Sequence, residues 1–313
     1  MQFEFEPIDF EVYIGGCGDA AVDSKGRIFA VSIPYPVTVF SQEGKILSRW
    51  PEDCCGCAHG IYIDENDFVY IADSDWHVFS KFSPGGDLLM QAGTKGRPSA
   101  SGAEKGNYKT IRRGAGPFYA PSKITVSPRG EIFVADGYGN SRVHRFSSGG
   151  ELLASWGEPG GEPGQFRLVH GVGVDENDRV YVADRENDRV QIFDTEGRVL
   201  DIWNDIKRPD GLCVRDGIVY VPELGHLAYN DNVMYEPYEN MPWSQVRVFD
   251  TEGHELTRFG GEDPWKPGNL YSAHGANLDR EGSLYIADSG LPAPETAAPG
   301  KRRHALQKYR RIA

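Results

Sequence analysis

Three His-Gly pairs recur at one point of an internal repeat. They begin at His59, His170 and His274. Imidazole nitrogen is a common zinc ligand, and a catalytic zinc site keeps three protein ligands and one open position. The three histidines lie far apart in the chain, so they can meet only if the repeat is arranged around an axis. They therefore predict a metal centre that depends on the fold.

The repeat is a short β unit that occurs six times. Its clearest copies read HGIYIDENDFVYIAD (59–73), HGVGVDENDRVYVAD (170–184) and HGANLDREGSLYIAD (274–288). Weaker copies cover 18–32, 122–136 and 210–223. Alternating apolar residues separated by turn residues are strand and hairpin signals. Repeated units that cannot bury their faces alone indicate a closed radial array. The sequence predicts an all-β, six-bladed β-propeller with four antiparallel strands per blade, formed by 1–313 as a single domain.

Alternate blades carry the histidines, so approximate threefold symmetry would bring the three side chains to the central axis. The N-terminal FEFEPIDFEVY (3–13) is expected to pair with LQKYRRI (306–312) in the last blade, which would remove an open sheet edge. If the histidines open the innermost strands, three long insertions share their face of the propeller. These insertions cover 94–117, about 224–243, and 290–303. Loops on one rim of a rigid scaffold commonly build sites.

Four further residues are candidates for this face. Tyr138 and Arg185 follow the Ala-Asp that ends the second strand of two blades, which places them near the axis. A phenol beside a metal and a cation can have its pKa lowered enough to act as a base, and a guanidinium can bind a carboxylate bidentately. Asp210 occupies, in another blade, the repeat position that the histidines occupy in theirs. Three roles are open for it: a metal ligand, a hydrogen-bond acceptor or an exposed turn residue. His226 is a candidate substrate contact in a Tyr-rich insertion whose alternative role is packing.

Charge and hydropathy limit the partners. The chain has 33 basic and 46 acidic residues, a formal net charge of −13, which argues against nucleic acid because phosphate binding requires a basic surface. No apolar run approaches the roughly 20 residues that span a bilayer, and the acidic start does not resemble a signal peptide. We expect a cytoplasmic protein with a small-molecule substrate and no membrane partner. Oligomeric state has no signature in the sequence.

Two local clusters have alternative interpretations. The stretch 95–113 carries six basic residues and is either a solvated loop or a lid that attracts an anionic substrate. Cys54, Cys55 and Cys57 precede the first histidine pair. They are expected to be free or buried thiols, and a structural zinc-thiolate site is the alternative.

The repeats resemble NHL repeats, and the stretch 118–193 resembles the peptidyl-α-hydroxyglycine α-amidating lyase domain. The matching motifs are DGYGNSR (136–142), PGQF (163–166), the His170 position, ADRENDR (183–189), CAHGIYID (57–64) and SAHGANLD (272–279). The resemblance implies a six-bladed propeller with zinc on the three histidines, Tyr138 as the base and Arg185 as an active-site arginine. It also implies cleavage of an N-acyl-α-hydroxyglycine into an amide and glyoxylate.

Three positions depart from the family pattern. Ile33 stands where the resemblance places a second active-site arginine, and it becomes a candidate substrate contact. Gly275 replaces an aspartate of a structural calcium site, which makes calcium doubtful. Lys123 replaces an acidic residue and shares a register with Asp19, so an ion pair between them is a candidate substitute for the calcium. The absence of the family disulfide between the segments around Tyr119 and Gly139 fits a reducing compartment.

Three functions follow from these features. The leading hypothesis is a zinc-dependent lyase that cleaves the C–N bond of a small, anionic N-substituted α-hydroxyglycine-like (carbinolamide) substrate, releasing an amide and an aldehyde or keto acid such as glyoxylate. The second is a hydrolase that uses metal-bound hydroxide as the nucleophile. The third is a non-catalytic NHL platform that binds a partner protein. Three imidazoles suit zinc, but also cobalt, nickel or iron.

Overall fold

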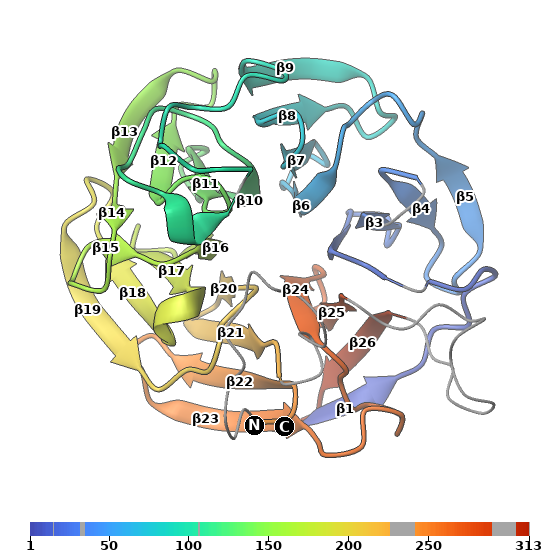
Figure 1. The fold of residues 1–313 in the computed structure, drawn as a ribbon. Helices are drawn as coiled ribbons and strands as arrows, with labels where there is room; N and C mark the ends of the chain where they lie inside the picture. Colours follow the sequence, from blue (N-terminus) through green and yellow to red (C-terminus); the bar gives the residue numbers. More distant parts are fainter. Residues whose placement is uncertain (15, 32–34, 106, 226–241, 290–304, 313) are drawn as a thin grey trace.

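The strands form six four-stranded antiparallel sheets around a central axis (Figure 1). This computed structural model describes all residues except 15, 32–34, 106, 226–241, 290–304 and 313. The helices of the described part are two 3-10 turns, η1 (Tyr108–Thr110) and η2 (Arg185–Asn187). Within the same residues, no helix is long and apolar enough to cross a membrane. The predicted all-β, six-bladed propeller is confirmed.

Each blade begins with its innermost strand. Blade 1 contains β2 (Asp19–Val22), β3 (Ile28–Val31), β4 (Thr38–Phe40) and β5 (Ile46–Arg49), and blade 2 contains β6 (Ala58–Ile63), β7 (Val69–Asp73), β8 (Val78–Phe82) and β9 (Leu88–Gly93). Blade 3 contains β10 (Pro121–Val126), β11 (Ile132–Asp136), β12 (Arg142–Phe146) and β13 (Leu152–Trp156), and blade 4 contains β16 (Val169–Val174), β17 (Val180–Asp184), β18 (Arg189–Phe193) and β19 (Val199–Asn204). Blade 5 contains β20 (Cys213–Arg215), β21 (Ile218–Glu223), β22 (Gln245–Asp250) and β23 (Glu255–Gly260). Blade 6 contains β24 (Ala273–Leu278), β25 (Leu284–Asp288), β26 (Leu306–Arg311) and β1 (Phe3–Glu6). A separate pair, β14 (Glu158–Pro159) and β15 (Gln165–Phe166), lies between blades 3 and 4 in the sequence.

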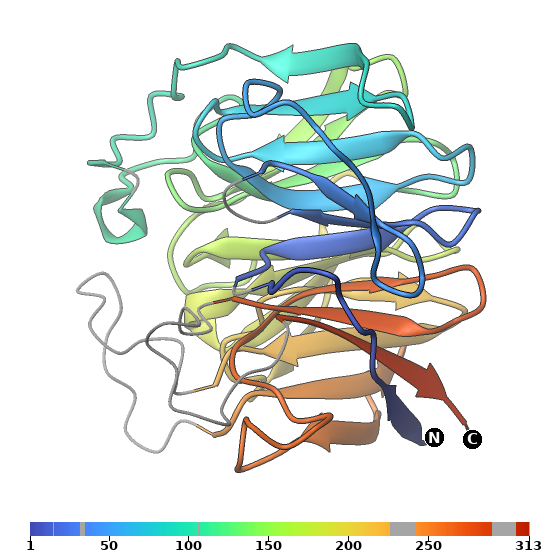
Figure 2. The same cartoon turned by 90° about the vertical axis from the view of Figure 1, so that its right-hand side faces the viewer.

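Blade 6 joins the two ends of the chain. Strand β1 pairs antiparallel with β26, with Phe3 opposite Arg311 and Glu6 opposite Lys308. The two termini lie side by side in both views (Figures 1 and 2). This pairing confirms the predicted closure, and it holds the first and last blades together so that the inner strands keep fixed positions around the axis.

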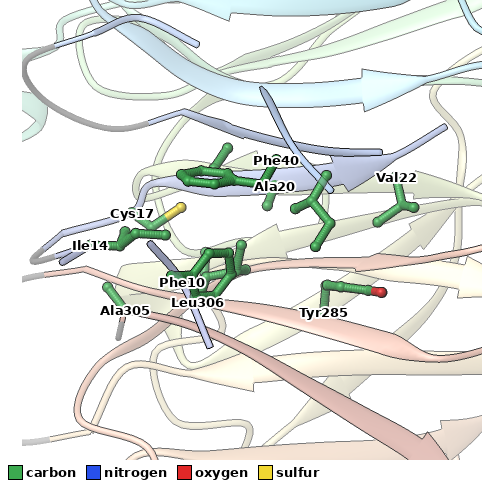
Figure 3. Packing of buried hydrophobic residues seen from close by; sticks show 12 residues of the cluster. Phe10, Ile14, Cys17, Ala20, Val22, Phe40, Tyr285, Ala305 and Leu306 are labelled. Carbon is green, nitrogen blue, oxygen red and sulfur yellow. The ribbon is translucent and has the colours of Figure 1, made fainter. Parts of the chain in front are cut away.

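Apolar side chains fill the space between neighbouring blades. The contact between blades 1 and 6 is one such cluster (Figure 3), and its buried members include Phe10, Ile14, Cys17, Ala20, Val22, Phe40, Tyr285, Ala305 and Leu306. Phe10 packs edge-on against Phe40 with ring centroids 5.1 Å apart. Because each sheet is covered on both faces, its second and third strands are buried along most of their length.

An acidic residue ends the second strand of most blades and anchors the segment that leads into the first strand. The carboxylate of Asp73 accepts hydrogen bonds from the backbone N–H groups of Gly56 and Cys57, at 2.6 and 3.0 Å. The carboxylate of Asp288 accepts one from the N–H of Ser272 at 2.7 Å. These bonds fix the start of β6 and β24, where two of the histidines lie.

The insertion 94–117 connects β9 to β10 and projects from one face of the disc (Figure 2). It is attached to blade 3, since the Ser101 hydroxyl donates to the Gly139 carbonyl at 2.5 Å and Asn140 Oδ1 accepts from the Ala115 N–H at 3.0 Å. It enters the first strand of a blade, so it lies at the histidine end of the propeller, as predicted. The insertions expected at about 224–243 and at 290–303 fall largely outside the described residues.

Candidate functional site

The structure brings His59, His170 and His274 together on the axis. Their candidate ligand nitrogens all lie within 4.8 Å of one another. The ring centroids of His59 and His170 are 5.1 Å apart, and those of His170 and His274 are 4.7 Å apart. The three rings line a cavity of about 10 Å³, roughly the smallest space that holds one water molecule or ion.

A β-bulge presents each histidine to the axis. In β6 the register passes from Ala58 opposite Asp73 to Gly60 opposite Ala72, which skips His59. The same shift occurs between Val169 and Gly171 in β16 and between Ala273 and Ala276 in β24. A bulge bends its strand and redirects a side chain. The repeat therefore encodes a strand start in which the histidine leaves the sheet.

Each histidine is oriented by a backbone carbonyl of the following blade. The donor–acceptor pairs are His59 Nδ1 to Ser122 O at 2.7 Å, His170 Nδ1 to Asp210 O at 3.0 Å, and His274 Nδ1 to Gly18 O at 2.6 Å. A neutral imidazole that donates from Nδ1 carries its lone pair on Nε2. Metal-binding histidines are commonly fixed in this way by a second hydrogen bond. The three Nε2 lone pairs therefore face the axis, away from these carbonyls.

The glycine of each His-Gly pair allows this approach. A Cβ on Gly60 would come within 2.5 Å of the Ser122 carbonyl oxygen, and one on Gly171 within 2.8 Å of the Asp210 carbonyl oxygen. These are the carbonyls that accept from the two histidines. The two residues of a His-Gly pair thus act together. The histidine supplies the ring nitrogen, and the glycine lets the next inner strand come close enough to orient the imidazole ring.

Burial keeps the three imidazoles neutral. It lowers the pKa of His59 to about 3 and the pKa values of His170 and His274 to about 4. Burial by itself would raise the pKa of Asp210, but its interactions with His170, His274 and Arg185 hold that pKa well below the ordinary range. The Asp210 Oδ2 atom lies 3.3 Å from His274 Nε2. A carboxylate that faces an imidazole lone pair is repulsive unless a cation lies near both, so this donor set fits a divalent transition metal.

Tyr138 lies where two of the lone pairs point. Its hydroxyl oxygen is 3.0 Å from His59 Nε2 and 2.9 Å from His170 Nε2. The Arg185 guanidinium carbon lies 5.7 Å from the centre of the Tyr138 ring. The structure therefore places a phenol and a cation beside the three histidines, as the positions after the Ala-Asp motifs predicted.

Arg185 belongs to a buried row of alternating charges. Its Nη1 donates to Asp210 Oδ1 at 2.9 Å, and its Nε donates to Glu186 Oε1 at 3.1 Å. Glu186 Oε2 lies 3.1 Å from Arg208 Nη2. The side chains of Arg185 and Arg208 are 2 % and 1 % exposed. One carboxylate oxygen of Asp210 therefore accepts from Arg185, and the other faces His274. A role of Asp210 as a ligand stays a prediction.

Sequence reasoning missed Glu186 and Arg208. Glu186 directly follows Arg185 in the ADRENDR motif, and its charge looked like that of any turn residue. Arg208 lies two positions before Asp210 in a loop outside the repeat. Comparing the charged residues next to the axial position of each repeat would have identified both residues as candidates. Their contact could not be predicted, because it depends on the fold of that loop.

A second polar cluster lies next to the histidines along the axis. The Lys123 ammonium contacts the Asp19 carboxylate and lies 3.3 Å from the Ile61 carbonyl oxygen. Asn277 Nδ2 donates to the other Asp19 oxygen at 2.9 Å. The predicted ion pair between Lys123 and Asp19 is therefore present.

The remaining predicted positions have simple outcomes. Ile33 and His226 fall outside the described residues. The five cysteines, all in the described part of the chain, are free thiols. Cys54 and Cys55 have their sulfur atoms 3.8 Å apart. This agrees with the expectation of free or buried thiols.

Known proteins are similar to this chain in sequence. Residues 118–146 and 166–193 match the NHL repeat. Peptidylglycine alpha-amidating monooxygenase of Rattus norvegicus is 34% identical over 277 residues, covering 82% of this chain and 24% of the rat protein. Peptidyl-alpha-hydroxyglycine alpha-amidating lyase 1 of Drosophila melanogaster is 32% identical over 117 residues, covering 37% of this chain and 19% of the fly protein. The chain thus spans a quarter or less of the length of these relatives.

The architecture also recurs in a solved structure. A streptogramin B lyase superposes with a TM-score of 0.61 and 11% identity, covering 98% of this chain and 97% of the other. At that identity the likeness shows the fold alone. From its repeats, its six blades and its homologues, the chain is an NHL-repeat six-bladed β-propeller with curated relatives named as peptidyl-α-hydroxyglycine α-amidating lyases.

Proposed function

We propose that this protein is a metal-dependent lyase. It cleaves the C–N bond of a small N-substituted α-hydroxyglycine and releases an amide and glyoxylate. The observation that supports this most strongly is the set of three imidazoles, each oriented through Nδ1, whose Nε2 atoms converge beside Tyr138. His59, His170 and His274 would hold the ion, with zinc as the first choice. When bound, the ion supplies Lewis acidity for a substrate oxygen.

Tyr138 is the proposed base. Its hydroxyl oxygen lies within hydrogen-bond distance of His59 and His170, at the point where a substrate oxygen would arrive. The phenolate accepts the proton of the substrate hydroxyl, the C–O bond becomes a carbonyl, and the C–N bond breaks. The leaving amide nitrogen then takes this proton from Tyr138. Atoms balance without water, because the substrate divides into an amide and an aldehyde.

Arg185 is the proposed anion contact. Asp210 and Glu186 hold its guanidinium in one orientation beside the Tyr138 ring. A fixed cation favours both the phenolate of Tyr138 and an anionic substrate. Ile33 stands where the resemblance implies a second arginine, so we propose a small substrate rather than a peptide. The free cysteines fit a reducing compartment such as the cytoplasm.

Metal content and product identity test the proposal together. Wild type, His170→Ala and the control His254→Ala are purified without a tag, and bound metals are measured by mass spectrometry. His254 is a matched control because it lies on the exposed surface and bonds Asp250. We expect about one transition metal per chain in wild type and the control, and less than a tenth of that in His170→Ala. Equal metal content in all three proteins would contradict the proposed centre.

The substrate for the same proteins is N-benzoyl-α-hydroxyglycine. A lyase releases benzamide and glyoxylate, whereas an amide hydrolase releases benzoate. We expect benzamide from wild type and the control, and none above background from His170→Ala. Benzoate as the main product would replace the lyase with a hydrolase.

A further inference from the structure

A second cavity opens beside the row of charges that contains Arg185. It has a volume of about 550 Å³ and lies between the insertion 94–117 and the loops that enter blades 4 and 5. Its lining includes Tyr108, Lys109, Phe166, Arg167, Glu186 and Arg208. Nothing in the proposed reaction uses the residues that the insertion contributes. The cavity therefore needs its own explanation.

The charge of this cavity is opposite to that of the protein. Among the described residues of its lining, Lys109, Arg167 and Arg208 are basic and Glu186 is acidic, although the whole chain carries a net charge of −13. Lys109 and Arg167 are exposed, whereas Arg208 is buried and bonded to Glu186. A concave basic site in an acidic protein attracts an anion and draws it to one place.

A chain of buried side-chain contacts connects the lining of the cavity to the proposed reaction centre. One oxygen of Glu186 contacts Arg208 in the cavity, and the other contacts Arg185, which in turn bonds Asp210 behind His170. A single carboxylate thus separates the two arginines. A substrate held at Arg185 and long enough to pass Glu186 would extend towards this cavity.

The insertion holds its side of the cavity in place. The 3-10 turn η1 is capped by Asn107, whose side chain accepts from the Lys109 N–H at 3.0 Å. The Thr110 hydroxyl donates to the Asn107 carbonyl at 2.7 Å, and Thr110 also accepts from the Glu104 N–H at 2.7 Å. These bonds fix the backbone that carries Tyr108 and Lys109. A site fixed before binding loses less conformational entropy when the ligand arrives.

We infer that this cavity is the specificity site for the acyl side of the substrate and that it binds a carboxylate. This inference rests on the proposed lyase function and adds the substrate class: an N-acyl-α-hydroxyglycine whose acyl group ends in a second carboxylate. Lys109 and Arg167 attract that carboxylate at the rim, and Arg208 provides the cationic floor. Tyr108, which is half-buried in the cavity lining, supplies aromatic surface for the methylene groups between the two ends of the substrate.

The test compares two substrates that differ in this carboxylate. N-succinyl-α-hydroxyglycine and N-acetyl-α-hydroxyglycine are assayed with wild type, the double variant Lys109→Gln/Arg167→Gln, and the control Arg129→Gln. Arg129 is an exposed arginine in the turn between β10 and β11, paired with Asp178 and outside the cavity lining. We expect wild type and the control to prefer the succinyl substrate about tenfold in kcat/KM. The double variant should lose this preference through a higher KM, with kcat and metal content unchanged.

A binding measurement separates this inference from the proposed reaction. Succinamate, the amide product of the succinyl substrate, is titrated into each protein by calorimetry, with acetamide as the neutral comparison. Succinamate should bind wild type and Arg129→Gln at least tenfold more tightly than the double variant, even if neither substrate is cleaved. Equal affinity across the three proteins, or equal kcat/KM for the two substrates in wild type, would overturn the specificity site while leaving the lyase proposal standing.

Discussion

Two neighbouring polar layers on the propeller axis differ in how their groups are satisfied. In one, the Lys123 ammonium meets the Asp19 carboxylate, and Asn277 bonds the other carboxylate oxygen. In the other, His59, His170 and His274 direct like atoms at a common point. Both layers come from inner strands, and both are largely buried.

The difference separates a layer whose charges are paired within the protein from a layer that we propose binds a metal ion. Opposite charges close the Lys123 layer, and a buried polar group that has its partner stabilises the fold without needing a ligand. The histidine layer uses its Nδ1 atoms for the protein and leaves its Nε2 lone pairs directed at one place. The following predictions test this contrast, from the largest expected effect to the smallest.

Metal removal should affect the histidine layer alone. An ion that binds only the folded protein adds about 4 kcal/mol to its stability at a thousandfold excess over Kd. We expect a transition-metal chelator to abolish activity and lower the Tm of wild type, and zinc to restore both. The Tm of His59→Ala should not respond to either treatment. Calcium, added or removed with a calcium-selective chelator, should leave the Tm of wild type unchanged, and a calcium-dependent rise would contradict a closed Lys123 layer.

Tyr138→Phe removes the proposed base and keeps the ring. General base catalysis typically contributes a factor of 10²–10⁴, so kcat should fall by about that factor. Metal content should stay at the wild-type level, because the histidines are oriented by backbone carbonyls and not by the phenol. Steady-state kinetics and metal analysis on one preparation measure both. A variant with normal kcat would exclude Tyr138 as the base.

Lys123→Met tests the structural layer. It leaves the buried Asp19 carboxylate without its cation, and breaking a buried ion pair typically costs about 3–5 kcal/mol. The free energy of unfolding in urea should fall by that amount, while the metal bound per folded chain stays the same. The double variant Asp19→Asn/Lys123→Met should recover most of the loss. If it is no more stable than the single variant, the ion pair is not the source of the effect.

The pH dependence of the metal-free protein tests the burial of the histidines. Their pKa values in the folded state are about 3 to 4, below the ordinary 6.5. Below pH 6.5 the unfolded chain therefore binds protons that the folded chain does not, and stability falls as the pH falls towards 4. Each histidine contributes a slope of at most about 1.4 kcal/mol per pH unit. Urea unfolding at pH 7 and pH 5 should show a smaller loss in His170→Gln than in wild type.

Most of the fold was predictable because one unit repeats. The six copies of the repeat predicted the number of blades. The alternation of apolar residues within each copy predicted its strands, and the order of those strands predicted the inner position of the histidines. The pairing of β1 with β26 followed from the need to close the last blade. The positions of Tyr138 and Arg185 followed from the same repeat, since both come after the second strand of a blade. The contact between Lys123 and Asp19 followed from their shared register.

The sequence by itself determined which residues reach the axis, because side-chain direction and strand order are set by the repeat. Tertiary structure alone decided how those residues are connected. The carbonyls that orient the histidines come from neighbouring blades, and the contact of Glu186 with Arg185 and Arg208 depends on two loops outside the repeat. The cavity beneath η1 likewise forms where an insertion folds over another blade. The segments that make these contacts are not spaced by the repeat length. Their contacts therefore cannot be predicted from the repeat, and only the folded propeller brings them together.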